Sequence, residues 1–470
     1  MRSSKKIDML EAITPIDGRY RDRLAECSDY FSEYALIRRR FHVELVYLEE
    51  LARQNRELVS KLPDGWAERL RKIGYDFDFG EAEKVKTLES SIGHDVVAVT
   101  EYLAERLRSH GLEPLIPYIH LGLTSEDINN LAQSTILRDF IRGPYLRETG
   151  MLLEKLVKLA REHRGTPMLA RTHGQPAAPT TFGRFLAGYA YRVGRLATQI
   201  ADMVWYGKIG GAVGDLNALT LAYPEMDTER LVSAVLERVG LRFFPASTQI
   251  LPNDPHSENI FVVAVLSSVL SNMARDFWLL GMLGYLRFEK VGELVHSSAM
   301  PQKNNPIHLE NAEGSLDMAS EMLSYISRRL ISSRLHRDLS DSVVRRFYGV
   351  ALPTAYLGLK SLVRALDSVR VDAEMMRHDL EMHPEADAER LQVLLRRHGQ
   401  SDGYELARRA LEKGLGWLSE ELERRGLDAA VREEILSVRM EEYLRASMES
   451  VDRLLADVEK FIETIRGQMR

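Results

Sequence analysis

The run from Ser297 to Pro306 (SSAMPQKNNP) combines two hydroxyls, one lysine and three carboxamides, and it contains no acidic residue. A segment of this composition makes a poor helix and a poor core strand, but its donors suit a pocket for an anionic ligand. Ser298 is a weak base unless its oxyanion is stabilised, and Lys303 together with loop N–H groups could stabilise it where water is excluded. The sequence therefore predicts a proton-abstracting serine in an anion-binding loop. An ordinary polar loop is the alternative.

A second candidate group is His173, within the segment Leu169–Pro176. We expect this segment to be a loop between two helices, because Pro176 and Pro179 prevent a helix from continuing. A loop histidine titrates near neutrality and can be oriented by a neighbouring group, so it could protonate a leaving group. The alternative is a hydrogen-bonded surface histidine.

The third segment, Arg337–Arg346, predicts the start of a helix with Ser340 or Asp341 as its N-cap. Ser342 and Arg346 are four residues apart and therefore share a helix face. With Arg337 they would make a phosphate-binding group at a helix N-terminus. An exposed, charged helix start is the alternative.

Other kinds of chemistry have less support. The 13 histidines include no HExxH pattern, and the one cysteine, Cys27, excludes an intramolecular disulfide and a cysteine-based metal site. The glycine-rich stretch Gly207–Gly214 matches neither a P-loop nor a dinucleotide fingerprint, so we expect a tight turn there. A Gly-x-Ser-x-Gly elbow is missing, which disfavours acyl-transfer hydrolysis. We therefore expect no metal and no cofactor.

Composition is that of an ordinary soluble globular protein, with 45% hydrophobic and 28% charged residues among 470 and a formal net charge of −6. Without a long basic run, nothing in the charge pattern favours nucleic acid or a membrane surface as a partner. The longest uncharged stretch, 259–274, falls short of the ~20 residues that span a membrane, and residues 1–10 lack the apolar region of a secretory signal. We expect a cytoplasmic protein.

The elements that must position these groups are mainly helices. Proline-free segments with helical character cover 181–206, 260–291 and 309–333, while alternating strand patterns are scarce. The sequence therefore predicts an all-α fold, a long-helix bundle at 115–366 flanked by smaller helical domains at 1–114 and 367–470. Stretches such as 261–266 and 278–283 are apolar nearly all round, so we expect association with other subunits.

Taken together, the motifs resemble the fumarase/aspartase superfamily and, within it, the adenylosuccinate lyase branch. The resemblance runs along essentially the whole chain. The segments that carry it, besides the serine-lysine loop, are Pro15–Tyr20 (PIDGRY), Gly93–Asp95 (GHD), Thr124–Asn130 (TSEDINN), Arg171–Ala177 (RTHGQPA), Thr248–Gln249 and Arg337–Asp338. The serine loop alone is typical of the superfamily, whereas TSEDINN and RTHG distinguish this branch from argininosuccinate lyase and fumarase.

The resemblance implies a β-elimination that releases fumarate from adenylosuccinate, and from the succinyl-carboxamide ribotide of purine synthesis. By the family pattern Ser298 is the base, His173 is the acid and His94 contacts the substrate and orients the acid. Lys303 and Asn305 would stabilise the dianionic aci-carboxylate. The implied substrate-binding residues are Thr124, Ser125 and Gln249 at the succinyl end, Arg19, Tyr20, Arg337, Ser342 and Arg346 at the nucleotide end, and also Gly93, Asp95, Asn304 and Asn311. The family further implies a homotetramer whose sites are shared between three subunits.

Two positions depart from the family pattern. His296 stands where glycine is usual, just before the two serines, and Gly93 stands where some relatives carry asparagine. Two alternatives stay open. One is a superfamily lyase acting on a different fumarate adduct, although a phosphate-binding group argues against a non-phosphorylated substrate. The other is a non-catalytic scaffold, which should have lost at least one of His173, Ser298 and Lys303.

Overall fold

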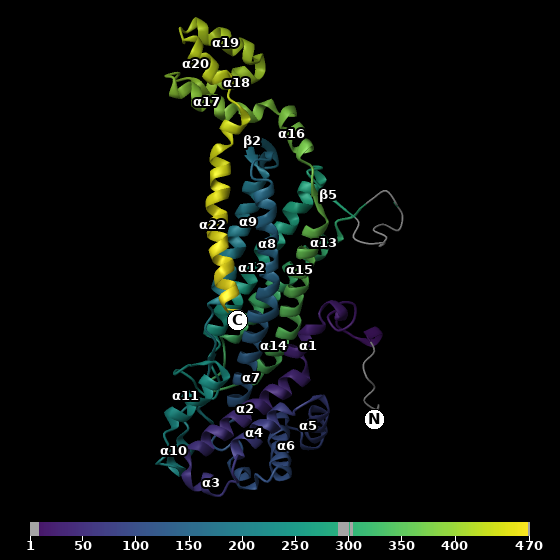
Figure 1. The fold of residues 1–470 in the computed structure, drawn as a ribbon, viewed down its shortest axis with the longest axis vertical. Helices are drawn as coiled ribbons and strands as arrows, with labels where there is room; N and C mark the ends of the chain where they lie inside the picture. Colours follow the sequence, from purple (N-terminus) through teal and green to yellow (C-terminus); the bar gives the residue numbers. More distant parts are fainter. Residues whose placement is uncertain (1–8, 290–299, 301–303, 469–470) are drawn as a thin grey trace.

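The computed structural model describes residues 9–289, 300 and 304–468, and within them helices dominate. Strands in these ranges form three two-stranded pairs. Long helices run side by side along the long axis, with the N-terminal helices at one end and a small helical cluster at the other (Figure 1). The predicted all-α fold is confirmed.

The N-terminal helices enclose an apolar cluster of their own, which includes Phe41, Phe77 and Leu103. Polar caps define several of these helices: the Ser32 hydroxyl accepts a hydrogen bond from the Ala35 N–H, and Asp78 caps the helix after it in the same way. The helices are α1 (Ser28–Phe31), α2 (Glu33–Gln54), α3 (Arg56–Ser60), α4 (Trp66–Tyr75), α5 (Phe79–Ile92) and α6 (Asp95–Ser109), followed by the 3-10 helix η4 (Glu113–Tyr118). Short 3-10 turns precede them at η1 (Met9–Glu11), η2 (Arg21–Arg23) and η3 (Ala25–Cys27).

The central bundle is built from long helices that share the largest apolar core. They are α7 (Ser125–Phe140), α8 (Leu146–Glu162), α9 (Phe182–Ala201), α12 (Asp254–Met282), α13 (Ile307–Leu330), α15 (Tyr348–Ser368) and α22 (Arg445–Gln468). The three predicted proline-free helices correspond to α9, α12 and α13, but α12 ends at Met282, and residues 286–288 of the predicted segment 260–291 form a strand instead. By length and composition α12 is the one helix of the described residues that could cross a membrane, but 61% of its most apolar stretch of 18 residues is buried inside the protein.

Helices α7 and α8 form one continuous helical run, joined by a π-helical segment, η5 (Ile141–Tyr145), that contains Gly143 and Pro144. A π turn is wider than an α turn and tolerates the missing proline N–H. At 1.5 Å per residue, the run from Ser125 to Glu162 spans on the order of 50 Å.

Beyond the end of α8 the chain forms a β-hairpin of β1 (Pro167–Thr172) and β2 (Gln175–Thr181) before α9 begins. The segment does lie between two helices, as predicted, and His173 is in a turn, but the residues on either side of that turn form paired strands instead of an irregular loop. The prolines do exclude a helix, as argued, but Pro176 and Pro179 are accommodated in an isolated two-stranded ribbon.

Shorter elements complete the chain. Between α9 and α12 lie β3 (Tyr206–Gly207), α10 (Asn217–Ala222), α11 (Thr228–Val239) and β4 (Arg242–Phe243). Strand β5 (Leu286–Phe288) pairs with β6 (Val369–Val371), and α14 (Ser340–Arg346) and α15 lie between these two strands in the sequence. The C-terminal part comprises α16 (Ala373–Met382), η6 (Pro384–Asp387), α17 (Ala388–Arg397), α18 (Gly403–Lys413), α19 (Leu415–Arg424), α20 (Ala429–Leu436) and α21 (Met440–Tyr443).

The predicted domain boundaries stay a prediction. The packing of the helices after residue 366 shows which of them contact the central bundle. Leu391, Leu406 and Leu418 belong to a small apolar cluster formed within α17–α20. In contrast, α22 packs along α9 and α8, and Val451 and Val458 are part of the large core. The last helix thus contributes to the bundle.

Candidate active site

The start of α7 is fixed by a buried carboxylate. Thr124 is the N-cap, and Asp127 completes a capping box by accepting the Thr124 N–H at 2.9 Å. The same carboxylate accepts the N–H groups of Gly210 and Gly211, both at 2.9 Å, and the Lys208 ammonium at 2.6 Å. Because Asp127 and Lys208 are both fully buried, this ion pair ties the glycine-rich turn to the helix start.

A second carboxylate at the start of α7 holds two arginines. Glu126 is 2% exposed and lies 2.6 Å from Arg345 Nη1 and 3.4 Å from Arg337 Nη1. Since one carboxylate pairs with both cations, Arg337 lies close to the start of α7, where Thr124 and Ser125 precede Glu126 in the sequence. Gln249 belongs to the same region because its amide donates to the Ala212 carbonyl, 3.0 Å away, in the glycine-rich turn.

Helix α14 begins differently from the prediction. Its N-cap is Leu339, so Ser340 and Asp341 lie inside the helix and the predicted cap was wrong. The preceding Asp338 carboxylate instead accepts the Ser340 N–H at 2.7 Å, together with the Ser340 hydroxyl. These hydrogen bonds lower the pKa of Asp338.

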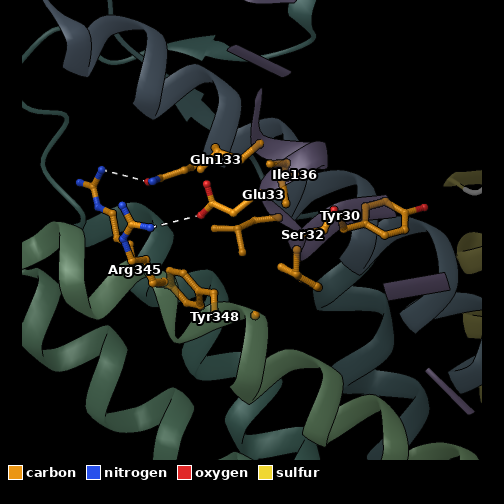
Figure 2. A pocket seen from close by; sticks show the side chains of 12 residues that line it. Tyr30, Ser32, Glu33, Gln133, Ile136, Arg345 and Tyr348 are labelled. Atoms are coloured by element: carbon orange, nitrogen blue, oxygen red, sulfur yellow. Dashed lines mark hydrogen bonds and ion pairs between the residues drawn. The ribbon is translucent and has the colours of Figure 1, made fainter. Parts of the chain in front are cut away.

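Ser342 is half-buried on α14, whereas Arg346 is exposed and pairs with Glu33 of α2 at 3.3 Å. This pair lies beside a cavity of about 170 Å³ between α2, α7 and the α14–α15 junction, lined by Tyr30, Tyr348 and others (Figure 2). An arginine that is held at the rim of a cavity by a partly exposed partner is available to an anionic ligand.

The GHD segment joins α5 to α6. Gly93 ends α5 in the left-handed region, at φ 76°, and His94 caps α6 by accepting the Val97 N–H through Nδ1. Asp95 pairs with Arg40 at 2.7 Å. Burial would raise the pKa of Asp95, but Arg40, the Val96 N–H and His94 together outweigh burial and lower it. Arg40 Nε also donates to Asn129 of α7 at 2.8 Å, so it connects the GHD segment to α7.

The PIDGRY segment packs on α13. Asn311 donates to the Tyr20 hydroxyl at 3.4 Å and accepts the Ser361 hydroxyl at 2.6 Å, while Arg19 is exposed nearby in sequence. Asn304 and Asn305 lie directly before α13, the first exposed and the second half-buried. Ser298, Lys303 and His296 lie outside the described residues.

His173 lies far from the start of α7. It occupies the two-residue turn of the β1–β2 hairpin with Gly174, at φ 54° and 74°, and its side chain is exposed. The hairpin lies beyond the end of α8, whereas Thr124 and Ser125 lie at the start of α7, so roughly 50 Å of helix separates them within this chain (Figure 1). The neighbouring Arg171 is paired internally with Asp379, 2.7 Å away.

The structure thus brings together Thr124, Ser125, Gln249 and Arg337, but it leaves His173 apart. Sequence reasoning missed the carboxylates Glu126 and Asp127 and their partners Lys208 and Arg345, although both acids stand inside the TSEDINN motif. Among the described residues, no group of three His, Cys, Asp or Glu side chains could hold a metal ion.

Solved structures define the class of fold. A fumarate lyase from Mesorhizobium sp. BNC1 matches with a TM-score of 0.72 at 22% identity, covering 93% of this chain and 97% of that one. A 3-carboxy-cis,cis-muconate lactonizing enzyme from Pseudomonas putida matches with a TM-score of 0.71 at 21% identity, with the same coverage. The fold is therefore the one shared by these enzymes.

Sequence comparison is more specific. A lyase family model matches residues 18–319, and an adenylosuccinate lyase C-terminal model matches residues 333–444. Adenylosuccinate lyase of Legionella pneumophila is 36% identical over 400 residues, 84% of this chain and 87% of the relative. That of Escherichia coli K12 is 35% identical over 410 residues, with 85% and 88% covered. The chain belongs to the adenylosuccinate lyase family.

Proposed function

We propose that this lyase eliminates fumarate from adenylosuccinate to give AMP, and from succinyl-aminoimidazole-carboxamide ribotide to give the carboxamide ribotide. Membership of the family supports the reaction class. The observation that carries the proposal is the match of residues 333–444 to the adenylosuccinate lyase C-terminal model, since this region contains Arg337, Ser342 and Arg346. Those residues suit the phosphate that both substrates share.

In this mechanism Ser298 removes a proton from the succinyl carbon next to a carboxylate. The electron pair forms the C=C bond of fumarate, the C–N bond breaks, and His173 protonates the departing nitrogen. Negative charge develops on the carboxylate as the proton leaves, and Lys303 and Asn305 stabilise it. Thr124, Ser125 and Gln249 bind the succinyl end. His94 contacts the substrate and orients His173, and no cofactor takes part.

The separation of His173 from Ser125 within one subunit supports a site shared between copies of the chain. Exposed apolar side chains on α12 and α13, among them Phe261, Trp278 and Met318, provide surface for such contacts. We propose a cytoplasmic homotetramer that acts on small phosphorylated purine substrates and engages neither nucleic acid nor a membrane. A stable monomer in light scattering after size exclusion would contradict the shared site.

The first experiment measures fumarate release from adenylosuccinate, with argininosuccinate in parallel. Release from adenylosuccinate alone is expected, and release from argininosuccinate alone would assign a different adduct. His173→Ala or Ser298→Ala should lower kcat by about 10²–10⁴-fold. His110→Ala, at the end of α6, is the matched histidine control and should leave kcat unchanged.

Mixing variants tests the shared site directly. His173→Ala and Arg337→Ala should each be nearly inactive alone, but oligomers assembled from both should regain activity. Recovery is expected because some sites then draw His173 from one subunit and Arg337 from another. No recovery in stable mixed oligomers would place both residues of a site in the same subunit.

A further inference from the structure

The hairpin that carries His173 is attached to the C-terminal part of the chain by polar contacts of one carboxylate in addition to apolar packing. Asp379 of α16 pairs with Arg171 of β1 at 2.7 Å through Oδ2, and the Tyr285 hydroxyl donates to the same oxygen. His383 Nε2 lies 3.5 Å from the other oxygen. The Asp379 side chain is 15% exposed, so these contacts replace most of its hydration.

The geometry of the hairpin links the position of Arg171 to the direction in which the turn at His173 points. The register of the two strands shifts between Ala170 and Arg171, and such a bulge redirects a side chain. Only Thr172 separates Arg171 from His173, and the two-residue turn with both φ angles positive leaves His173 little freedom relative to the strands. The direction of the His173 Cα–Cβ bond therefore follows the orientation of the hairpin.

Apolar packing alone would not set this orientation. Leu169 of β1 packs with Leu380 and Ala386, but apolar contacts do not fix an angle. A charged, hydrogen-bonded pair does, because both the distance and the direction of the guanidinium are constrained.

Through Tyr285, Asp379 also contacts the segment that precedes the serine run in the sequence. It directly precedes β5, and its carbonyl accepts the Asp372 N–H at 2.9 Å. Strand β5 ends at Phe288, and Ser298 follows ten positions later in the sequence. The Asp379 carboxylate thus contacts Arg171 in the hairpin that carries His173. It also contacts Tyr285, directly before β5, and the serine run follows β5 in the sequence.

The carboxylate is held in its charged form. Burial would raise the pKa of Asp379, but the hydrogen bonds from Tyr285 and Arg171 outweigh burial and lower it. Burial, followed by the contact with Asp379, raises the pKa of Tyr285, so the phenol remains a donor.

We propose that Asp379 is a positioning residue for the elimination: through Arg171 it orients the hairpin that presents His173, and through Tyr285 it fixes the start of β5. This inference rests on the proposed function, in which His173 is the acid. Asp379 acts only through the two elements that it holds.

Asp379→Asn tests the proposal because it keeps the size of the side chain and removes its charge. We expect kcat for fumarate release to fall by about 10–100-fold, since a misplacement of about 1 Å can cost that much, while KM changes by less than about threefold. Tyr285→Phe removes only a hydroxyl and should lower kcat by about 3–10-fold. Thermal unfolding and light scattering establish that the variants remain folded and assembled.

Asp372→Asn is the matched control. Asp372, the N-cap of α16, also pairs with an arginine, Arg287 of β5, but among the described residues its side chain makes no hydrogen bond or ion pair with the hairpin, and asparagine can still cap the helix. Its kcat should stay within about twofold of the parent. Asp379→Asn with an unchanged kcat, or with a raised KM at an unchanged kcat, would overturn the inference. If that variant does not fold, an unchanged kcat in Tyr285→Phe would do the same. A parent enzyme without activity on adenylosuccinate would instead refute the proposed function.

Discussion

Replacing Lys208 with methionine should destabilise the protein far more than removing an ordinary ion pair. Lys208 and Asp127 are both fully buried, so the substitution leaves a charge without its counter-ion in the interior. Breaking such a pair costs about 3–5 kcal/mol. Asp127 would keep the N–H donors of Thr124, Gly210 and Gly211, which replace part of the lost interaction. We therefore expect a loss near the lower end, about 3 kcal/mol.

Urea unfolding at pH 7 and a fixed protein concentration measures this loss, because the stability of an oligomer depends on concentration. Lys61→Met is the control: Lys61 pairs with Glu57 on the surface, with side chains 57% and 82% exposed, and its loss should leave the free energy of unfolding essentially unchanged because solvent screens the pair. The double variant Asp127→Asn, Lys208→Met should be more stable than Lys208→Met, because it removes the uncompensated charge. A loss for Lys208→Met within about 1 kcal/mol of the control would refute the reasoning.

Three further predictions follow from other contacts. Glu33→Gln should free Arg346 for the substrate and lower KM for adenylosuccinate by up to about fivefold, because an exposed pair is worth at most about 1 kcal/mol; a raised KM would contradict this. Burial would raise the pKa of Glu49, but hydrogen bonds from three arginines lower it to about 2. Its stabilisation is therefore complete above the ordinary value of 4.5 and lost as pH falls through about 2, so the Tm deficit of Glu49→Gln should shrink over that window. Gly183→Ala should lower Tm, since the new Cβ would lie 2.6 Å from backbone at the end of α8, whereas Gly150→Ala, with nothing within 4 Å, should raise it.

The helical part of the fold could be predicted because its signals are local. The absence of proline and the apolar periodicity identify α9, α12 and α13 without any knowledge of their partners. The hairpin could not be predicted in this way. Its strands contain Pro167, Pro176 and Pro179, and pairing in an isolated ribbon depends on contacts with α16 and η6 that lie some 200 positions further along the chain.

The candidate site was predictable in its residue types but not in its arrangement. The motif TSEDINN indicated Thr124 and Ser125 as ligands. It did not indicate that the next two residues, Glu126 and Asp127, form buried ion pairs with Arg345 and Lys208. The partner of Asp127 is Lys208, which lies 81 positions further along the chain in the glycine-rich turn. A buried ion pair leaves no periodic signal in a sequence, so only the packed chain reveals it.

The π-helical segment between α7 and α8 also limits how the length of this chain can vary. A π turn holds one residue more than an α turn, so the two halves of the run are rotated relative to an uninterrupted helix. Deleting Gly143 would restore an ordinary α turn and leave the two halves in nearly the same relative rotation, because five residues of a π turn advance the helix by roughly as much as four residues of an α turn. Deleting a residue of α8 before Leu152 would instead rotate the rest of that helix by about 100°. Leu152 and Leu156, both fully buried, would then leave the core face. A single-residue deletion in the run from Ser125 to Glu162 should therefore be tolerated in η5 but not in α7 or α8, and length changes among relatives should fall in η5 or in the flanking turns.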